Sequence, residues 1–265
     1  VTASLLITGD RGMFIVNASI ILIYIFWRQY LDKEIWIPTK FIVIGILCIP
    51  IAIAGMSFFV FIREGVDVGD HTFTAQFLRF FRSTGNTIDL LGYGKEYQNK
   101  FTQNFYSFGE LIDYIKYNPI SQVVLGVTKP TPHTQEYATT MHSYAHMISY
   151  IITPELYLEG HGKGSSYIAE VYHDFSYLGV ILCNIIYGVL LSALYKLKKT
   201  GPIITAAFFI GIRIMFYVPR GAMIMPVTYV LNITTLTVLI GMWLLAKYYP
   251  FIISCLNLKK LKKEK

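Results

Sequence analysis

Long apolar stretches separated by short charged borders constrain this chain more than any other feature. Five such stretches cover about residues 12–27, 41–62, 175–195, 202–218 and 222–247. Roughly 20 consecutive apolar residues are enough to cross the hydrocarbon core of a bilayer as a helix. Hydrophobic residues make up 54% of the sequence, which is too apolar for an ordinary soluble domain. The pattern therefore predicts an all-α polytopic membrane protein with about five transmembrane helices.

The predicted helices divide the chain into four parts. Residues 1–62 hold two transmembrane helices and a short polar connection, residues 63–174 form one large loop, residues 175–247 hold three more helices, and residues 248–265 form a basic tail. Residues 1–7 are apolar and resemble the end of a preceding segment. We therefore expect additional helices on the N-terminal side of this chain.

The distribution of lysine predicts the orientation in the membrane. Lysines cluster at residues 196–199 and 247–265, and an even number of predicted helices separates the two clusters. Because lysine and arginine concentrate in cytoplasmic loops, both clusters are predicted to be cytoplasmic. The C-terminus is then inside and the large loop is outside. The opposite membrane border carries arginine alone, at Arg11, Arg63 and Arg220.

The large loop has the composition of a folded polar domain. It contains all six histidines, and its acidic residues outnumber its lysines and arginines by 12 to 8. Tyrosine and phenylalanine are frequent in residues 93–172, which suits either stacking on sugar rings or a small core. The net charge of +7 is spread over the membrane flanks, so nucleic acid is not an expected partner. The three cysteines lie in apolar segments and have no metal-ligand spacing.

The junction between the large loop and the third apolar stretch concentrates charged side chains at Glu170, His173 and Asp174. If a helix begins after Ser166, then Glu170 and Asp174 share one face with Tyr167 and Tyr177. Two carboxylates on one stripe at the membrane surface suggest the rim of an active site. The alternative is that they only solvate the start of a helix, where acids also suit the helix dipole.

A second group of candidates lies within the large loop. His142 and His146 are spaced i and i+4, as in zinc-binding helices. The glutamate that lies between such histidines in metalloproteases is absent, so we expect no metal here. A general base or a sugar-binding histidine is the better interpretation.

Arg213 is the one charged residue well inside a predicted transmembrane helix. An arginine in the hydrocarbon region is costly unless it is paired or faces a polar cavity, which makes it a functional candidate. Arg220 follows two helical turns later, so the two are expected to project from one helix face. Arginine suits bidentate binding of phosphate. The alternative is a structural ion pair between Arg213 and a carboxylate outside this chain.

Two motifs resemble a known family. Residues 9–12 (GDRG) open one apolar stretch, the large loop follows, and residues 165–179 (SSYIAEVYHDFSYLG) open another. This arrangement is similar to that of the Wzy-type polymerases of O-antigen and capsular polysaccharide repeat units, over roughly residues 9–220. Ser176 stands where a glycine is expected beside Phe175.

The resemblance implies a glycosyltransferase of the bacterial cytoplasmic (inner) membrane. Such an enzyme moves a growing glycan from undecaprenyl diphosphate onto a lipid-linked repeat unit at the outer face. Its partners would be the lipid-linked oligosaccharide, the bilayer and a chain-length regulator, and no cofactor or metal is expected. Glu170, His173 or Asp174 would take the acceptor proton, with His142 or His146 as the alternative base. The diphosphate would be bound by four arginines: Arg11, Arg63, Arg213 and Arg220.

Two other functions fit a similar architecture. A polysaccharide ligase would use the same arginines but make a single transfer. A non-enzymatic exporter of lipid-linked oligosaccharides would use them for binding alone. An exporter is expected to carry charged groups along a path through its helices, and only Arg213 lies deep within one here.

Overall fold

The computed structural model describes residues 11–64, 72–102 and 105–263. These residues form helices joined by turns and short irregular segments, and no strand occurs among them. The prediction of an all-α protein is confirmed.

Six of the helices carry most of the apolar sequence. They are α2 (Arg11–Asp32), α3 (Thr39–Glu64), α11 (Tyr167–Ser192), α12 (Pro202–Met215), α13 (Met225–Leu231) and α14 (Ile233–Lys263). Two segments in the described ranges, Gly12–Asp32 and Tyr167–Leu197, are long and apolar enough to span a membrane. A third appears if α13 and the first part of α14, bent by 52°, count as one span. The expected number of about five spans is not confirmed, and the two or three candidate spans are consistent with a membrane protein.

Helix α12 illustrates why the number of spans differs from the prediction. It has 14 residues. At 1.5 Å per residue it is roughly 21 Å long, which is shorter than a bilayer core of about 30 Å. Lys196 to Lys199 were expected to close a span, and they lie in the short helix η3 (Ala193–Lys199) that leads into α12.

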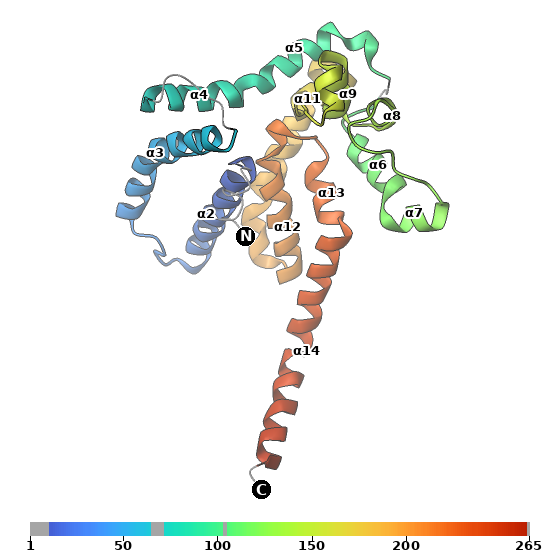
Figure 1. The fold of residues 1–265 in the computed structure, drawn as a ribbon. Helices are drawn as coiled ribbons and strands as arrows, with labels where there is room; N and C mark the ends of the chain where they lie inside the picture. Colours follow the sequence, from blue (N-terminus) through green and yellow to red (C-terminus); the bar gives the residue numbers. More distant parts are fainter. Residues whose placement is uncertain (1–10, 65–71, 103–104, 264–265) are drawn as a thin grey trace.

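Helix α12 packs against α13 and α2 in the centre of the molecule (Figure 1). The rings of Tyr24 and Trp27 on α2 contact Phe209 on α12 at centroid distances of 5.6 and 5.3 Å. The indole of Trp27 also donates a hydrogen bond to the carbonyl of Leu194 at 3.1 Å. Helix α14 extends from this bundle toward the C-terminus (Figure 1).

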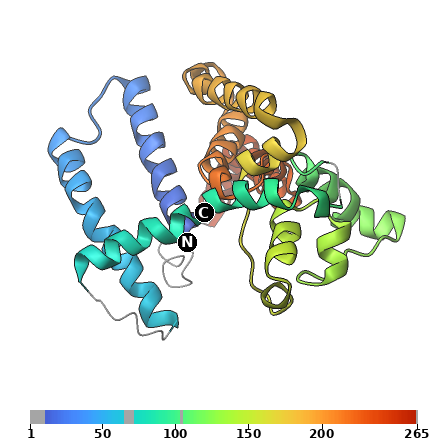
Figure 2. The same ribbon diagram turned by 90° about the horizontal axis from the view of Figure 1, so that it is seen from above.

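The large loop is folded into short helices at one end of α11 (Figure 1). They are α4 (Phe73–Gly85), α5 (Asp89–Glu96), α6 (Gly109–Tyr117), α7 (Pro119–Leu125), α8 (Gln135–Thr140), α9 (Tyr144–Ile152) and α10 (Pro154–Leu158). Viewed from above, α4 and α5 cross the molecule from the α2–α3 side to the other loop helices (Figure 2).

The core of the large loop is built around the first turn of α11. Buried Tyr106, Tyr144 and Ile148 pack with Ala169 of α11. Burying large aromatic side chains contributes much of the stability of a small domain. Part of the aromatic content of residues 93–172 is therefore core, and this core fixes the loop helices relative to α11.

Helix α11 begins at Tyr167 with Ser166 as its N-cap residue, as predicted. Its regular geometry is interrupted at Ser176, which has φ 56° and ψ −157°. A helix face that continues from Glu170 and Asp174 to Tyr177 was expected, and this expectation is wrong because the kink at Ser176 separates Tyr177 from the first two turns.

Ser176 occupies a backbone conformation that essentially only glycine adopts without strain. We expect Ser176→Gly to stabilise the protein by roughly 1 kcal/mol or more, since a non-glycine residue there costs about 1–3 kcal/mol. Thermal unfolding of the detergent-solubilised protein measures this effect. Ser192→Gly is the control, because Ser192 has helical φ −65° and ψ −22° and glycine should destabilise it. Equal shifts for both variants would contradict the interpretation.

Candidate active site at the end of the membrane helices

Glu170 lies at the start of α11 and connects it to the turn that follows Arg220. Its side chain is 1% exposed. One carboxylate oxygen accepts a hydrogen bond from the Ser165 hydroxyl at 2.6 Å, and the other accepts one from the Met223 backbone N–H at 2.8 Å. A carboxylate this enclosed, with both oxygens bonded, holds two segments together and has little room for a sugar hydroxyl.

Asp174 connects α11 to the segment before α6. Its side chain has 0% exposure. One oxygen accepts hydrogen bonds from the backbone N–H groups of Tyr106 and Ser107 at 2.9 and 2.7 Å. The other contacts Nδ1 of His173 at 2.9 Å.

His173 is packed among aromatic rings of the loop core. Phe101 and Tyr106 lie at ring-centroid distances of 4.6 and 5.2 Å from it. Its side chain is 10% exposed, and the cavity that it lines has a volume of only about 60 Å³. The structure thus brings His173 and Asp174 together as a pair, in a space that is too small for a sugar.

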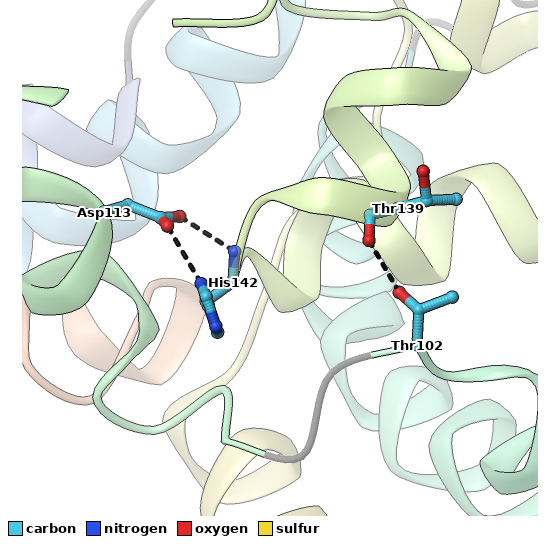
Figure 3. A network of polar contacts seen from close by, with 4 residues as sticks. All are labelled: Thr102, Asp113, Thr139 and His142. Carbon is cyan, nitrogen blue, oxygen red and sulfur yellow. Dashed lines mark hydrogen bonds and ion pairs between the residues drawn. The ribbon is translucent and has the colours of Figure 1, made fainter. Parts of the chain in front are cut away.

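His142 forms a second aspartate–histidine pair, which is more exposed. It lies between α8 and α9, and Asp113 of α6 contacts both its backbone N–H (2.9 Å) and its ring Nδ1 (3.0 Å), as shown in Figure 3. The His142 side chain is 24% exposed. Since an ionised carboxylate only accepts hydrogen bonds, Nδ1 carries the proton and Nε2 is the free acceptor of the neutral ring.

The backbone around His142 is firmly anchored. Its neighbour Met141 is buried, and the Thr102 hydroxyl donates a hydrogen bond to the Thr139 carbonyl at 2.9 Å (Figure 3). At the start of α6, a Cβ atom on Gly109 would lie 1.8 Å from the His142 carbonyl oxygen. Glycine is therefore required there for α6 to approach closely enough for Asp113 to reach His142. Burial raises the pKa of Asp113, and the hydrogen bonds from His142 oppose that rise.

His146 lies in the first turn of α9 and differs chemically from His142. Its Nδ1 contacts the Tyr157 hydroxyl at 3.0 Å, and the rings of Tyr137 and His133 pack against it. Burial lowers the pKa of His146 to about 4, and the nearby charges of His133 and Lys129 act in the same direction. Burial also raises the pKa of Tyr157 to about 12, so its phenol stays protonated. Nothing about this histidine makes it a strong proton acceptor at neutral pH.

The low pKa of His146 predicts a pH-dependent stability. The unfolded histidine titrates near 6.5. Between about pH 6.5 and 4 the unfolded state binds a proton that the folded state excludes, so stability falls as the pH is lowered, by roughly 1–2 kcal/mol for this partly exposed ring. We expect His146→Gln to flatten this dependence in denaturation measured from pH 7.5 to 4.5. Parallel stability curves for the two proteins would show that another group is responsible.

The arginines predicted to bind diphosphate fall into two sets. Arg11 is the first residue of α2 and Arg63 lies in the last turn of α3, and their side chains are outside the part that the structure describes. Arg213 lies in the last turn of α12, and its Nε is buried without a hydrogen-bond partner among the described residues. Arg220 is exposed.

Arg213 and Arg220 do not share one helix. Helix α12 ends at Met215, and Arg220 lies in the separate short helix η4 (Val218–Arg220). The prediction of one continuous face is wrong, because Pro219 cannot continue the hydrogen-bonding pattern of α12. Met223, just after Arg220, donates to Glu170 and accepts a hydrogen bond from the Tyr187 hydroxyl of α11. These contacts fix the segment that carries Arg220 against α11.

A polar pocket of about 370 Å³ lies beside the His142–Asp113 pair. It is bounded by the large loop on one side and by α13 on the other. Its lining includes Glu110, Asp113, Tyr114, Lys129, His146, Thr228, Tyr229 and Asn232. The structure thus brings His146 and Asp113, the partner of His142, to one cavity, and it leaves His142 itself, Glu170, His173 and Asp174 outside the lining.

Several of the pocket residues were not singled out in the sequence. Glu110, Asp113, Tyr114 and Tyr117 follow one another at steps of three, one and three along α6, and all line the pocket. Residues with this spacing share one helix face. One helix face with two acids and two tyrosines is the sequence pattern from which these pocket residues could have been predicted.

The fold and this site define an integral membrane protein with a folded polar loop domain, a histidine held by an aspartate, and a polar pocket at the junction of loop and membrane helices. A model of the O-antigen polysaccharide polymerase Wzy family matches residues 1–250, so the chain belongs to that family. The family is one of polysaccharide polymerases, which act on lipid-linked oligosaccharides in a membrane. Searches of curated proteins and of solved structures gave no match.

Proposed function

We propose that this protein polymerises lipid-linked oligosaccharide repeat units at the outer face of the bacterial cytoplasmic membrane. The observation that carries the proposal is the family match over residues 1–250, which includes the membrane helices and the whole large loop. The donor in this proposal is a glycan on undecaprenyl diphosphate and the acceptor is a single lipid-linked repeat unit. The product is O-antigen or capsular polysaccharide.

The proposed reaction is a displacement at the anomeric carbon of the donor glycan. A hydroxyl oxygen of the acceptor sugar forms the new bond to that carbon, and the bond from the same carbon to the diphosphate oxygen breaks. The hydroxyl proton passes to a base on the protein, and undecaprenyl diphosphate leaves with the bonding electrons. The protein must therefore supply a proton acceptor and cations for the leaving diphosphate.

His142 is the base in this proposal. Asp113 fixes the ring with Nε2 as the free acceptor, and the carboxylate stabilises the imidazolium that forms when the proton arrives. Exposure supports this choice over the other candidates, since the side chain of His142 is 24% exposed while those of His173 and Asp174 are 10% and 0% exposed. Glu170 and Asp174 then act as positioning residues that attach α11 to its neighbours.

Arg213 and Arg220 are the proposed ligands of the leaving diphosphate. The unpartnered Nε of Arg213 supports this role, because a buried guanidinium nitrogen without a hydrogen bond is costly unless a ligand completes it. Arg11 and Arg63 are proposed to contribute from α2 and α3. This arrangement requires the large loop outside the cell membrane and the C-terminus in the cytoplasm. A chain-length regulator is a proposed partner.

Polymer length in cells tests the proposal against its two alternatives. In a strain that lacks the gene, we expect surface polysaccharide on a gel to collapse from a ladder to single repeat units, and the wild-type gene to restore the ladder. Loss of all surface attachment with free polymer retained would indicate a ligase. Accumulation of lipid-linked oligosaccharide on the cytoplasmic side would indicate an exporter. An unchanged ladder in the strain that lacks the gene would show that this protein is not the polymerase.

A further inference from the structure

We propose that the polar pocket between the large loop and α13 binds uncharged sugar residues of the lipid-linked glycan and excludes its diphosphate. This inference rests on the proposed function and assigns one part of the substrate to one cavity. Its volume of about 370 Å³ is within the range of small-molecule sites, about 300–1,000 Å³.

The walls of the pocket are fixed to each other by hydrogen bonds. The Tyr114 hydroxyl of α6 donates to the Leu231 carbonyl at the end of α13, at 2.8 Å. The Thr228 hydroxyl of α13 contacts a carboxylate oxygen of Glu110 at 3.3 Å. The cavity is therefore formed before any ligand arrives, and it lies where the loop meets a membrane helix.

The pocket combines aromatic rings with polar groups. The Tyr114 hydroxyl is already engaged, so this residue offers its ring to a ligand. Tyr229 is 38% exposed and offers a second ring. Glu110 and Asn232 add a carboxylate and an amide to the lining. Sugars have apolar C–H faces that pack on aromatic rings and hydroxyl groups that donate to carboxylate and amide oxygens.

The charge of the pocket favours uncharged sugars. Glu110 and Asp113 contribute two carboxylates, and Lys129 contributes one ammonium group from an exposed position. Lys129 lies over the ring of Tyr137 at 5.9 Å. The two carboxylates repel further negative charge, and the burial that raises the pKa of both Glu110 and Asp113 also penalises any other anion placed beside them. A diphosphate or a sugar carboxylate would add to this repulsion.

Helix α13 connects the pocket to the membrane. Thr228, Tyr229 and Asn232 face the polar pocket. On its other side, Val227 and Val230 line an apolar groove of about 350 Å³ with residues of α12. A membrane lipid that lies along this groove is separated from the pocket by α13 alone. The glycan that it carries would then lie beside the pocket.

Binding of two oligosaccharides that differ only in charge to the purified full chain tests this inference. The first probe is the lipid-free repeat-unit oligosaccharide released by mild acid from the lipid-linked intermediate of the producing strain. The second is the same oligosaccharide after oxidation of its primary hydroxyls to carboxylates. We expect wild type to bind the first roughly tenfold more tightly than the second. Inorganic pyrophosphate should not compete with the first probe.

Two variants locate the binding to the pocket. Tyr229→Ala should weaken binding of the unmodified oligosaccharide about three- to tenfold, through loss of one stacking surface. Glu110→Gln should reduce the preference for the unoxidised probe severalfold. The control is Tyr30→Ala, since Tyr30 is an exposed tyrosine of α2 that does not line the pocket.

The outcomes separate this inference from the proposed function. Absence of oligosaccharide binding, equal binding of both probes, or binding that Tyr229→Ala and Glu110→Gln leave unchanged would overturn the pocket assignment, even with a normal polymer ladder. Failure of the proposed function would instead appear as a normal ladder in the strain without the gene. Binding with the expected preference and loss in Tyr229→Ala supports the assignment.

Discussion

Replacement of His142 by alanine is expected to lower the rate of polymer formation by about 10²–10⁴-fold, the usual contribution of a general base. The physical reason is that His142 is the more exposed of the two described histidines whose rings are held by an aspartate, Asp113 in its case. The measurement is incorporation of lipid-linked repeat unit into polymer by membranes that contain equal amounts of each variant. Binding of the donor should change little, because the base acts in the chemical step.

His161→Ala is the matched control, since His161 is an exposed histidine of the same loop for which the structure gives no role in the site. It should retain the wild-type rate. Asp113→Asn tests the positioning role of the carboxylate. The amide that replaces the carboxylate can donate a hydrogen bond to Nδ1 and so favour the tautomer that carries its proton on Nε2, which should lower the rate. A His142→Ala variant with the wild-type rate would return the role of base to His173.

Arg213→Ala is the second large effect we expect, with a loss of about 10²–10³ in rate, as for removal of one donor that stabilises developing charge. Arg213 brings a guanidinium group into a helix that carries no other charged residue, and its Nε is buried without a hydrogen-bond partner among the described residues. Arg213→Lys should recover only part of the activity, because an ammonium group cannot make the bidentate contact.

A matched arginine separates this role from a general requirement for positive charge. Arg28 lies near the C-terminal end of α2 and, like Arg213, has a buried Nε without a hydrogen-bond partner among the described residues, but its guanidinium group forms an ion pair with Asp32 at 3.0 Å. Arg28→Ala should leave polymer formation close to wild type. If Arg213→Ala, shown to be present in the membrane at normal levels, still makes full-length polymer, then Arg213 does not bind the leaving group.

The sequence allowed the helical class and several local features to be predicted. Apolar stretches of membrane-spanning length follow from composition alone, and the start of α11 at Tyr167 follows from Ser166 and the periodicity after it. The shared helix face of Glu170 and Asp174 could also be predicted from the sequence, because it depends only on helical spacing. What spacing cannot give is the partner of a side chain. In the structure, Glu170 accepts a hydrogen bond from the backbone N–H of Met223, and Asp174 accepts one from the backbone N–H of Tyr106. Both donors belong to segments that are distant in the sequence.

The His142–Asp113 pair and the polar pocket could not be derived from one sequence in the same way. Asp113 precedes His142 by 29 residues, and their contact depends on how α6 packs beside the turn before α9. Helix α6 and the turn before α9 are both short, and neither has a sequence pattern that predicts which segment it packs against. Gly109 is one requirement for this contact, since only a residue without a side chain lets the start of α6 approach the His142 backbone so closely. The sequence alone does not show which backbone segment Gly109 contacts.

Reconstitution of the purified protein with lipid-linked repeat units is the measurement that tests the central claim most directly. The account predicts that the protein alone, in a bilayer of defined lipids, converts these units into a ladder of products. It also predicts release of one undecaprenyl diphosphate for each linkage formed, with both signals lost in the His142→Ala protein. Intact lipid-linked units and no released undecaprenyl diphosphate, from a folded protein that restores the ladder in cells, would contradict it.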